Sequence, residues 1–231
     1  MITKRIIDEK GIDQTEDTVL VLGYFDGLHK GHQALFEKAR EIAAEQGLKI
    51  AVMTFPESPK LAFVRYQPEL MLHLASPEDR MAQLENLGVD YLYLIDFTSH
   101  FAGNTARDFF EKYVSRLRAK AVVAGFDYHF GSDRKESHEL RDYFNGKIVI
   151  VPSVNLDNRK ISSTRIRETI AVGDMLKTQE LLGYPLSTRG IVVHGNARGR
   201  TIGYPTANLA PLDRVLLPGD GVYVADVEHN G

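Results

Sequence analysis

The sequence predicts an α/β fold built on a doubly wound parallel sheet, and three observations lead to this prediction. Short continuous apolar runs, typical of strands buried on both faces, recur along the first 185 residues. Segments with helical spacing of apolar residues separate these runs. Glycine, proline and capping residues mark the boundaries between the two kinds of segment. Such repeated alternation predicts a parallel sheet whose ligands bind beyond the carboxyl ends of the strands.

The expected strands share a short apolar core and lie at regular intervals along the chain. In chain order they are residues 18–22, 49–54, 91–95, 121–124 and 147–151. The first of them, Thr18 to Leu22, is uninterrupted by any charge and ends at Gly23. A strand of this composition belongs in the middle of a parallel sheet rather than at its edge.

The segments between and after these strands show helical apolar spacing or helix-start signals. The expected helices are residues 31–46, a helix that begins at Pro77, and residues 105–117, 136–145, 163–171 and 174–182. Gly47 is placed to end the first helix, because glycine readily takes the left-handed conformation common at helix ends. Ser76 is the expected N-cap of the second helix, with Pro77 at its first position.

The pattern changes after Gly183-Tyr184-Pro185, where we place a domain boundary. Short β-like segments follow, such as residues 190–193 and 221–225, separated by glycine and proline turns. The remaining stretch is shorter than a small barrel needs to bury a core. We therefore expect an α/β domain of residues 1–185 and an incomplete all-β unit of residues 186–231.

The composition excludes several kinds of catalytic or metal site and argues against several classes of partner. The sequence has no cysteine, which excludes disulfides, thiolate metal ligands and thiol nucleophiles. Its net charge of -3 gives no general attraction to nucleic acid, so a polyanion site requires a local cluster of suitable groups. Apolar runs are too short for a spanning helix, and early charges argue against a signal peptide. We expect a cytoplasmic protein with neither nucleic-acid nor membrane partners.

Two histidines lie where the first buried strand meets the first helix. His29 and His32 flank Gly31, and we expect their imidazoles and the free backbone amides of the helix start to converge on phosphate. We include Gly23, Phe25 and Gly31 in this predicted ATP-binding turn, since glycine permits tight turns and close approach of a ligand. The alternatives are two surface histidines or a weak HxxH zinc site. Strand, glycines and spacing together favour the phosphate site.

A cluster of hydroxyl and basic residues precedes the helix 163–171. Ser163 or Thr164 is expected to cap that helix, while Arg165 and Arg167 add positive charge near its N-terminus. Taken alone, the cluster fits a capped helix with a solvated basic face as well as it fits an anion-binding site. Together with the histidines it predicts a triphosphate clamp, suited to transfer reactions in which catalysis is mostly positioning and charge neutralisation.

Four motifs, in order along the chain, resemble those of prokaryotic bifunctional riboflavin kinase/FAD synthetases. They are GYFDGLHKGHQ (23–33), GFDYHFGSDR (125–134), ISSTRIR (161–167) and GNARGRTIGYPTAN (195–208). The resemblance implies a Rossmann-like nucleotidyltransferase domain of the HxGH type followed by an incomplete flavokinase barrel. It also implies transfer of AMP from ATP to FMN with release of pyrophosphate, assisted by Mg²⁺, and phosphorylation of riboflavin in full-length members.

The resemblance also implies roles for individual residues of the transferase motifs. His29 and His32 would hold phosphates and stabilise the transition state. The departing phosphates would be bound by Ser163, Thr164 and Arg167. Asp127 would lie at the nucleotide or flavin site, and Arg165 is added to the phosphate site on physical grounds alone.

The kinase-like motif carries its own expected site. Its loop over phosphates would use Gly195, Gly199, Gly203 and Pro205. Thr206 and Asn208 would offer hard oxygen ligands to Mg²⁺. The family uses a downstream glutamate as the kinase base, and residues up to Gly231 supply none, so we expect no riboflavin phosphorylation by this chain.

Two positions depart from the family pattern. Ser58 stands where a histidine is usual, and Glu136 stands where a glycine often occurs, which puts the expected contacts with the flavin in doubt.

The alternative hypotheses are a nucleotidyltransferase for another phosphate acceptor and a non-catalytic flavin or nucleotide sensor. A nucleic-acid binder is disfavoured by the acidic balance and by the lack of interleaved aromatic residues near the basic cluster.

Overall fold

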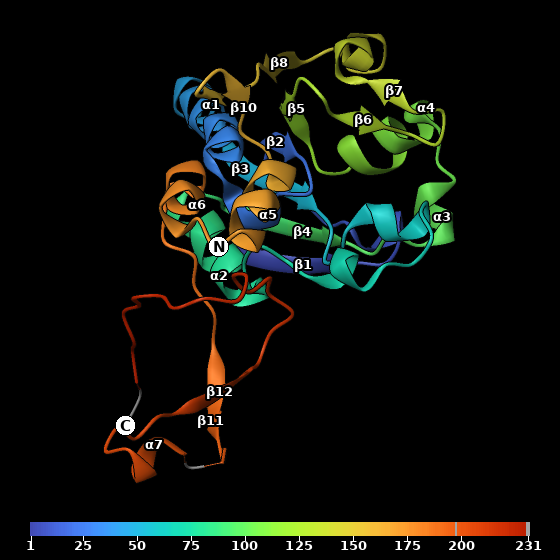
Figure 1. Ribbon diagram of the computed structural model, residues 1–231. Helices are drawn as coiled ribbons and strands as arrows, with labels where there is room; N and C mark the ends of the chain where they lie inside the picture. Colours follow the sequence, from blue (N-terminus) through green and yellow to red (C-terminus); the bar gives the residue numbers. More distant parts are fainter. Residues whose placement is uncertain (197, 230–231) are drawn as a thin grey trace.

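Six parallel strands form the central sheet, in the order β1-β4-β3-β2-β5-β8 (Figure 1). The computed structural model describes residues 1–196 and 198–229. The strands are β1 (Ile2–Ile6), β2 (Thr18–Leu22), β3 (Lys49–Thr54), β4 (Tyr91–Ile95), β5 (Ala119–Gly125) and β8 (Lys147–Val151). From β2 the order runs outward in both directions, so the winding reverses between the neighbours β2 and β5. The predicted doubly wound parallel sheet is confirmed.

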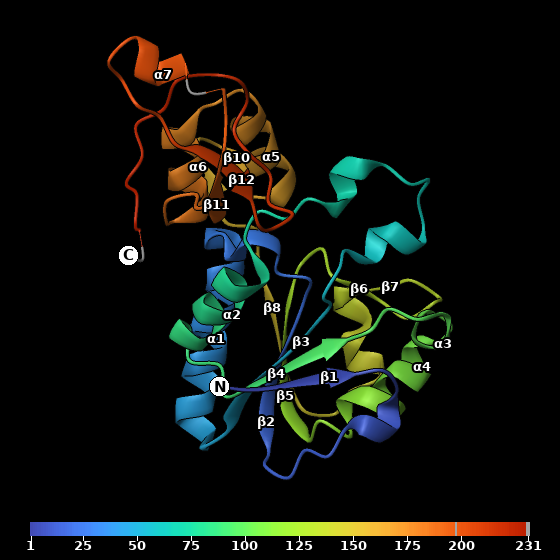
Figure 2. The same ribbon diagram turned by 90° about the horizontal axis from the view of Figure 1, so that it is seen from below.

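The sheet is covered on both faces, which explains its apolar strands. Helices α1 (Lys30–Gln46) and α2 (Pro77–Asn86) lie on one face, and α3 (Ser99–Ala102) and α4 (Ala106–Phe109) lie on the other (Figure 2). Because neighbouring side chains of a strand point to opposite faces, Val19 packs with Phe36 of α1, and Leu20 belongs to the cluster around Tyr113. All five residues of β2 are buried, as expected for the central strand.

The N-terminal strand β1 was not predicted. It pairs only with β4, so it is an edge strand, and its sequence ITKRI places three polar or charged residues between two isoleucines instead of forming an apolar run. Charge on an edge strand disfavours pairing with other chains. Such a strand carries little of the signal by which the buried strands were recognised.

Two predicted helices differ from the structure. The segment 105–117 is not one helix: α4 is followed by a wider π-helical turn, Phe110–Val114. Both the amide and the hydroxyl of Ser115 donate to the Phe110 carbonyl at 2.9 Å, which fixes the wide turn. The segment 136–145 contains only a 3₁₀ helix, Ser137–Asp142.

Two short hairpins were not predicted. One pairs β6 (His129–Phe130) with β7 (Lys135–Glu136), and the other pairs β9 (Asn155–Leu156) with β10 (Arg159–Lys160).

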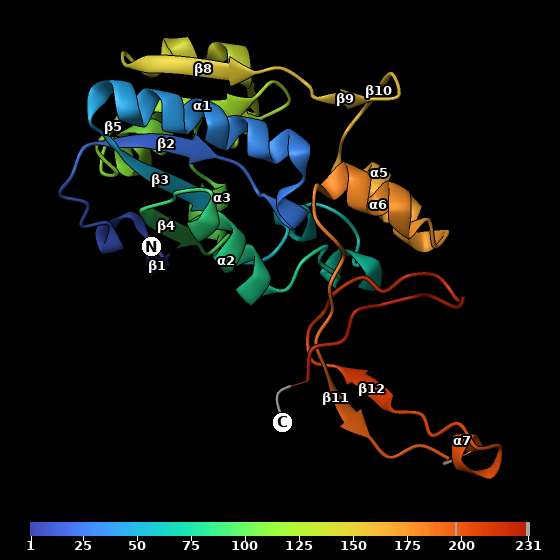
Figure 3. The ribbon, with the colours of Figure 1, turned by 90° about the vertical axis from the view of Figure 1, so that its left-hand side faces the viewer.

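Helices α5 (Ser163–Ala171) and α6 (Met175–Leu182) lie beyond the carboxyl ends of β2 and β8 (Figure 3). They pack on each other around a small separate cluster that includes Ile166, Ile170 and Leu181. Gly183 ends α6 in the left-handed conformation. This helix pair therefore stands at the end of the sheet where parallel α/β proteins bind their ligands.

The segment after α6 forms an antiparallel hairpin, β11 (Gly190–Val193) with β12 (Asn208–Pro211), joined through α7 (Arg198–Thr201). The hairpin projects from the α/β unit (Figure 1). The strand expected at 221–225 is absent from the described residues, where Val222 and Val224 are fully exposed and pair with no neighbour. Ala197, Asn230 and Gly231 of the expected second unit lie outside the described residues. Across residues 1–196 and 198–229, no helix has the length and apolar character needed to cross a membrane.

Candidate active site

The connection from β2 to α1 contains three left-handed residues. Phe25, Gly27 and Leu28 have φ angles of 58°, 73° and 37°. Glycine takes such values freely, whereas phenylalanine and leucine do so at a cost. The buried carboxylate of Asp26 supports the turn, because it accepts the Leu74 backbone N–H at 2.8 Å. The turn lies at the carboxyl end of β2, beside the switch in strand order.

His29 and His32 stack on each other at the start of α1. Their ring centroids are 3.7 Å apart, and the ring planes differ by 14°. Nδ1 of His29 accepts the His32 backbone N–H at 3.3 Å, so His29 is the N-cap of α1 and carries its proton on Nε2. The His32 amide also donates to the His29 carbonyl at 2.7 Å. The prediction of free amides is therefore wrong for His32, because His29 already binds that donor.

Burial keeps both imidazoles neutral. His29 is 5% exposed, and this burial lowers its pKa to about 4, against the opposing effect of Asp26. The pKa of His32 lies well below its usual value, first because of burial and then because of His29. Nδ1 of His32 is buried and has no hydrogen-bond partner in the described part of the chain. The pair therefore offers a ligand neutral hydrogen-bonding groups and not fixed positive charges.

We expect the folded protein to lose stability as the pH falls from about 6.5 to about 4. Unfolded histidine takes up a proton near pH 6.5, whereas folded His29 does so only near pH 4, so the unfolded state binds more protons in this interval. The loss approaches about 1.4 kcal/mol per pH unit for each such histidine. Urea unfolding across this range measures the slope, and His29→Asn should reduce it by one such increment. Identical slopes would contradict a buried, neutral His29.

The glycines predicted in the turn lie where the surroundings leave little room for a side chain. A Cβ at Gly23 would lie 2.6 Å from the Phe25 ring. A Cβ at Gly31 would lie 3.1 Å from the His29 ring and 3.5 Å from the Ile161 carbonyl oxygen, just before α5. Phe25 itself is 1% exposed, and its ring meets the His32 ring edge to face at 5.3 Å. Phe25 therefore belongs to the predicted turn, but its side chain supports His32 from the core, so that only its backbone is left for the predicted contact with ATP.

The start of α5 lies against the histidine turn. Ser163 Oγ donates to the Asp26 carbonyl at 3.3 Å. Arg167 donates to the Asp26 carboxylate at 2.7 Å and to the Leu72 carbonyl at 2.6 Å. Thr164 is exposed beside them. The two halves of the predicted clamp therefore meet at one end of the sheet, with Asp26 between them.

The cap of α5 differs from the expectation. The N-cap is Ser162, whose hydroxyl accepts the Arg165 backbone N–H at 3.3 Å. Neither Ser163 nor Thr164 caps the helix, since both already belong to its first turn. Their hydroxyls are consequently not used to hold the helix start.

The phosphate role expected for Arg165 is also corrected. Arg165 is 7% exposed, and its guanidinium donates to the carbonyls of Leu156 and Arg159 at 2.8 and 2.9 Å. It also lies 3.4 Å from the Asp157 carboxylate. These contacts tie the β9–β10 hairpin to α5. The donors that would bind a phosphate are therefore engaged within the protein.

Asp127 lies in the connection after β5, where its carboxylate accepts a hydrogen bond from Lys160 of β10 at 2.5 Å. The Lys160 ammonium also lies 4.6 Å from the centroid of the Phe126 ring. Both charges act on the pKa of His29, in opposite directions, so the pair lies near the histidine turn. Lys160 was not predicted as a site residue, because one lysine in a two-residue strand gives no distinguishing pattern.

Two buried charged residues near the turn were also missed. Asp26 is 5% exposed and Arg80, in α2, is 9% exposed. Asp26 stands inside the glycine-bounded motif, so its position was visible but its partners were not. Arg80 gave no signal, because an arginine in an amphipathic helix normally belongs to the solvent face. Ser58 and Glu136, the two departures from the family pattern, lie in a groove after β3 and in β7 respectively.

The kinase-like motif lies on the β11–β12 hairpin. A Cβ at Gly195 would lie 2.1 Å from the Asn208 amide nitrogen, and one at Gly199 would lie 2.0 Å from the Tyr204 carbonyl oxygen. The glycines thus permit close contacts inside the hairpin and its connection. The metal-binding role of Asn208 and Thr206 stays a prediction.

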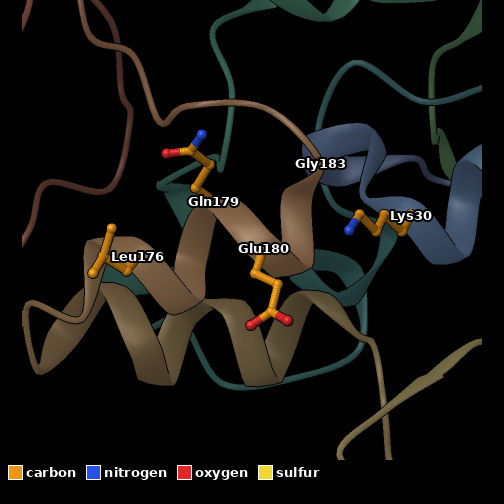
Figure 4. A pocket seen from close by; sticks show the side chains of 5 residues that line it. All are labelled: Lys30, Leu176, Gln179, Glu180 and Gly183. Atoms are coloured by element: carbon orange, nitrogen blue, oxygen red, sulfur yellow. The ribbon is translucent and has the colours of Figure 1, made fainter.

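Lys30, although part of the first motif, lines a different space. With Leu176, Gln179, Glu180 and Gly183 it borders a hollow of about 410 Å³ between α1 and α6 (Figure 4). Neither histidine lines this hollow. The candidate active site is the histidine turn with the start of α5.

Comparison with known proteins assigns the family. A model of FAD synthetases matches residues 11–165, which is more than half of the chain. The chain belongs to the FAD synthetase family. A riboflavin kinase model matches residues 182–231 of this FAD synthetase family member.

Relatives of this FAD synthetase family member agree with the assignment. The bifunctional riboflavin kinase/FMN adenylyltransferase of Listeria monocytogenes is 39% identical, over 92% of this chain and 68% of its own. The protein of the same name in Bacillus subtilis is 38% identical, over 95% and 70% of the two chains. A crystal structure from Streptococcus pneumoniae, described as a macrolide-efflux protein, matches with a TM-score of 0.91 and 52% identity, over 96% and 73% of the two chains.

Proposed function

We propose that this protein transfers AMP from ATP to the phosphate of FMN, forming FAD and pyrophosphate. One observation carries the proposal: the turn that holds the neutral pair His29 and His32 is joined, through Asp26, to Ser163 and Arg167 at the switch point of the sheet. The bifunctional relatives named above are FMN adenylyltransferases, which supports FMN as the acceptor. Use of ATP as donor favours a cytoplasmic location.

The reaction needs positioning and charge stabilisation more than proton transfer. An oxygen of the FMN phosphate forms a bond to the α-phosphorus of ATP, and the bond from that phosphorus to its bridging oxygen breaks. The bridging oxygen keeps the electron pair and leaves with pyrophosphate. We assign the Nε2–H of His29 and the ring of His32 to the oxygens where negative charge grows, which is the effective place for preorganised donors. Ser163, Thr164 and Arg167 are assigned to the departing phosphates.

A groove at the end of β3 suits the flavin ring. Its volume is about 220 Å³, and Phe55, Phe97 and Ser58 are among its lining residues. The rings of Phe55 and Phe97 meet edge to face, with centroids 5.3 Å apart. Arg5, Glu57 and Asp96 add charged groups to the same lining. Aromatic side chains beside a few polar groups favour a planar heterocycle that also forms hydrogen bonds. We propose this groove for the isoalloxazine ring, with Asp127 on the other side of the histidine turn for nucleotide or flavin contacts.

Magnesium is proposed to enter with ATP. In the part of the chain that the structure describes, no group of three histidine or carboxylate side chains is placed to hold a metal ion. Mg²⁺ binds commonly through substrate phosphates with few protein ligands. We expect a chelator to reduce FAD formation to background and added Mg²⁺ to restore it, measured by chromatography of the flavins. Full activity in chelator would contradict a requirement for the metal.

The acceptor is tested by incubating the protein with ATP, Mg²⁺ and FMN and following FAD and pyrophosphate together. We expect equal amounts of both products. Parallel reactions with pantetheine phosphate and glycerol phosphate test the alternative acceptors. Pyrophosphate release without FAD would overturn FMN as acceptor, and ATP binding without any turnover would favour the sensor.

We further propose that residues 1–185 form the adenylyltransferase domain and that residues 186–231 are the N-terminal part of a riboflavin kinase barrel. The separate ranges matched by the two family models support this division. The helix pair that ends at Gly183 and the hairpin that begins at Gly190 support it as well.

A further inference from the structure

Arg80 is a buried cation with no carboxylate partner among the described residues. Its side chain comes from α2, and the residue is 9% exposed. Its guanidinium donates to three uncharged acceptors: the Tyr24 carbonyl, the Thr54 hydroxyl and, at 2.9 Å, the Phe55 carbonyl. Its Nε has no hydrogen-bond partner in the described part of the chain.

Stability alone is a poor explanation for this arrangement. Removing a charge from water costs several kcal/mol, and hydrogen bonds to neutral acceptors return only part of that cost. Burial accordingly lowers the pKa of Arg80, and only Tyr24, Asp26 and Glu57 act against that effect. An apolar side chain of similar volume would fill the same space without this penalty.

The three acceptors share one location, the carboxyl ends of the neighbouring strands β2 and β3. The Tyr24 carbonyl also accepts the Thr54 hydroxyl at 2.8 Å. The guanidinium carbon of Arg80 lies 5.2 Å from the centroid of the Tyr24 ring. Arg80 therefore holds Tyr24 through both its backbone and its ring.

Tyr24 is the residue that enters the left-handed turn. Phe25 and Leu28 follow with φ angles of 58° and 37°. Non-glycine residues in this region cost about 1–3 kcal/mol each and persist only where the surroundings hold them. The contacts of Arg80 fix the peptide immediately before the turn, and the turn in turn sets the places of His29 and His32.

We propose that Arg80 is a positioning residue for adenylyl transfer, holding the turn from Tyr24 to Leu28 in the form that presents His29 and His32 to the nucleotide. The inference rests on the proposed function. Arg80 does not touch the reacting phosphates in this arrangement. Its effect is exerted through the backbone of the turn, so it should govern kcat more than substrate affinity.

The test compares Arg80→Met and Arg80→Lys with the wild type in steady-state FAD formation. A displacement of catalytic groups by about 1 Å costs about 10²-fold in rate, so Arg80→Met should lower kcat about 100-fold, with KM for ATP and FMN nearly unchanged. Arg80→Lys keeps the charge and one donor group, and should recover part of that loss. Arg40→Met, at an exposed arginine of α1, serves as the matched control and should keep the wild-type rate.

Rates are expressed per folded protein, with the folded fraction taken from circular dichroism. Wild-type kcat in folded Arg80→Met, or a rise in KM alone, would overturn the proposal. If Arg80→Met does not fold, Arg80→Lys decides: reduced kcat at unchanged KM supports the positioning role, and wild-type kcat overturns it. A wild type that forms no FAD would instead refute the proposed function, so the two failures are distinguishable.

Discussion

Replacing His29 with asparagine is expected to lower the rate of FAD formation about 10²- to 10³-fold, the usual cost of removing one preorganised transition-state donor. His29 has two roles that this substitution separates. Its Nδ1 caps α1 by accepting the His32 N–H, and its Nε2–H is left to face the substrate. Asparagine is among the best N-cap residues, so it preserves the first role and removes the second. The variant should fold normally and bind ATP while losing turnover.

His29→Ala removes both roles and should add a loss of stability of about 1 kcal/mol, the usual cost of losing an N-cap. His100→Asn is the matched control, because His100 is exposed and pairs with Glu9 at 2.9 Å, away from the turn. Rates are followed by chromatography of FAD under saturating ATP and FMN. Wild-type turnover in folded His29→Asn would remove His29 from the mechanism.

The parts of the fold that could be predicted are those specified by nearby residues. The buried strand Thr18–Leu22 carries its apolar run within itself, and the Ser76 cap of α2 accepts the amide of Asp79 only three residues away. Gly47 ends α1 in the left-handed conformation for the same local reason. Such signals do not depend on where the rest of the chain lies.

The errors concern residues whose roles are set by distant partners. Arg165 looked free to bind phosphate, but the β9–β10 hairpin brings three oxygen-bearing partners to it. The roles of Asp26 and Arg167 depend on a contact across 141 positions of sequence. Val222 and Val224 have strand-like sequence, yet a strand requires a neighbour to pair with, and the described residues provide none there.

In the candidate site, too, the locally specified features could be predicted and the features set by distant partners could not. The sequence located both motifs of the candidate site, because a strand, glycines and a capped helix are local signals. It did not show that the histidines are neutral, since their lowered pKa values come from burial by the assembled fold. It also did not show the buried ion pair that joins the two motifs.

The second large effect is expected for this ion pair, between Asp26 and Arg167, and concerns the stability of the folded state. Asp26→Asn should destabilise the folded state by about 3 kcal/mol, because it leaves Arg167 without its buried counter-charge. The Asp26 carboxylate is 5% exposed, and the Arg167 side chain is 31% exposed, which places the effect at the lower end of the range for buried pairs. Asparagine is nearly isosteric and can still accept the Leu74 N–H, so the loss reports mainly on the charge. Urea unfolding at neutral pH measures it.

A double-mutant cycle with Arg167→Met isolates the contact itself. If the pair is formed in solution, Asp26→Asn should cost much less in the Arg167→Met background than in the wild type. Asp17→Asn is the control, since Asp17 pairs with Arg118 at the surface and should cost at most about 1 kcal/mol. Strict additivity in the Asp26 cycle would mean that Arg167 is unpaired before substrate binds. Coupling would mean instead that Asp26 holds Arg167 in the free protein. Because we assign Arg167 to the departing phosphates, ATP would then compete with Asp26 for the same guanidinium.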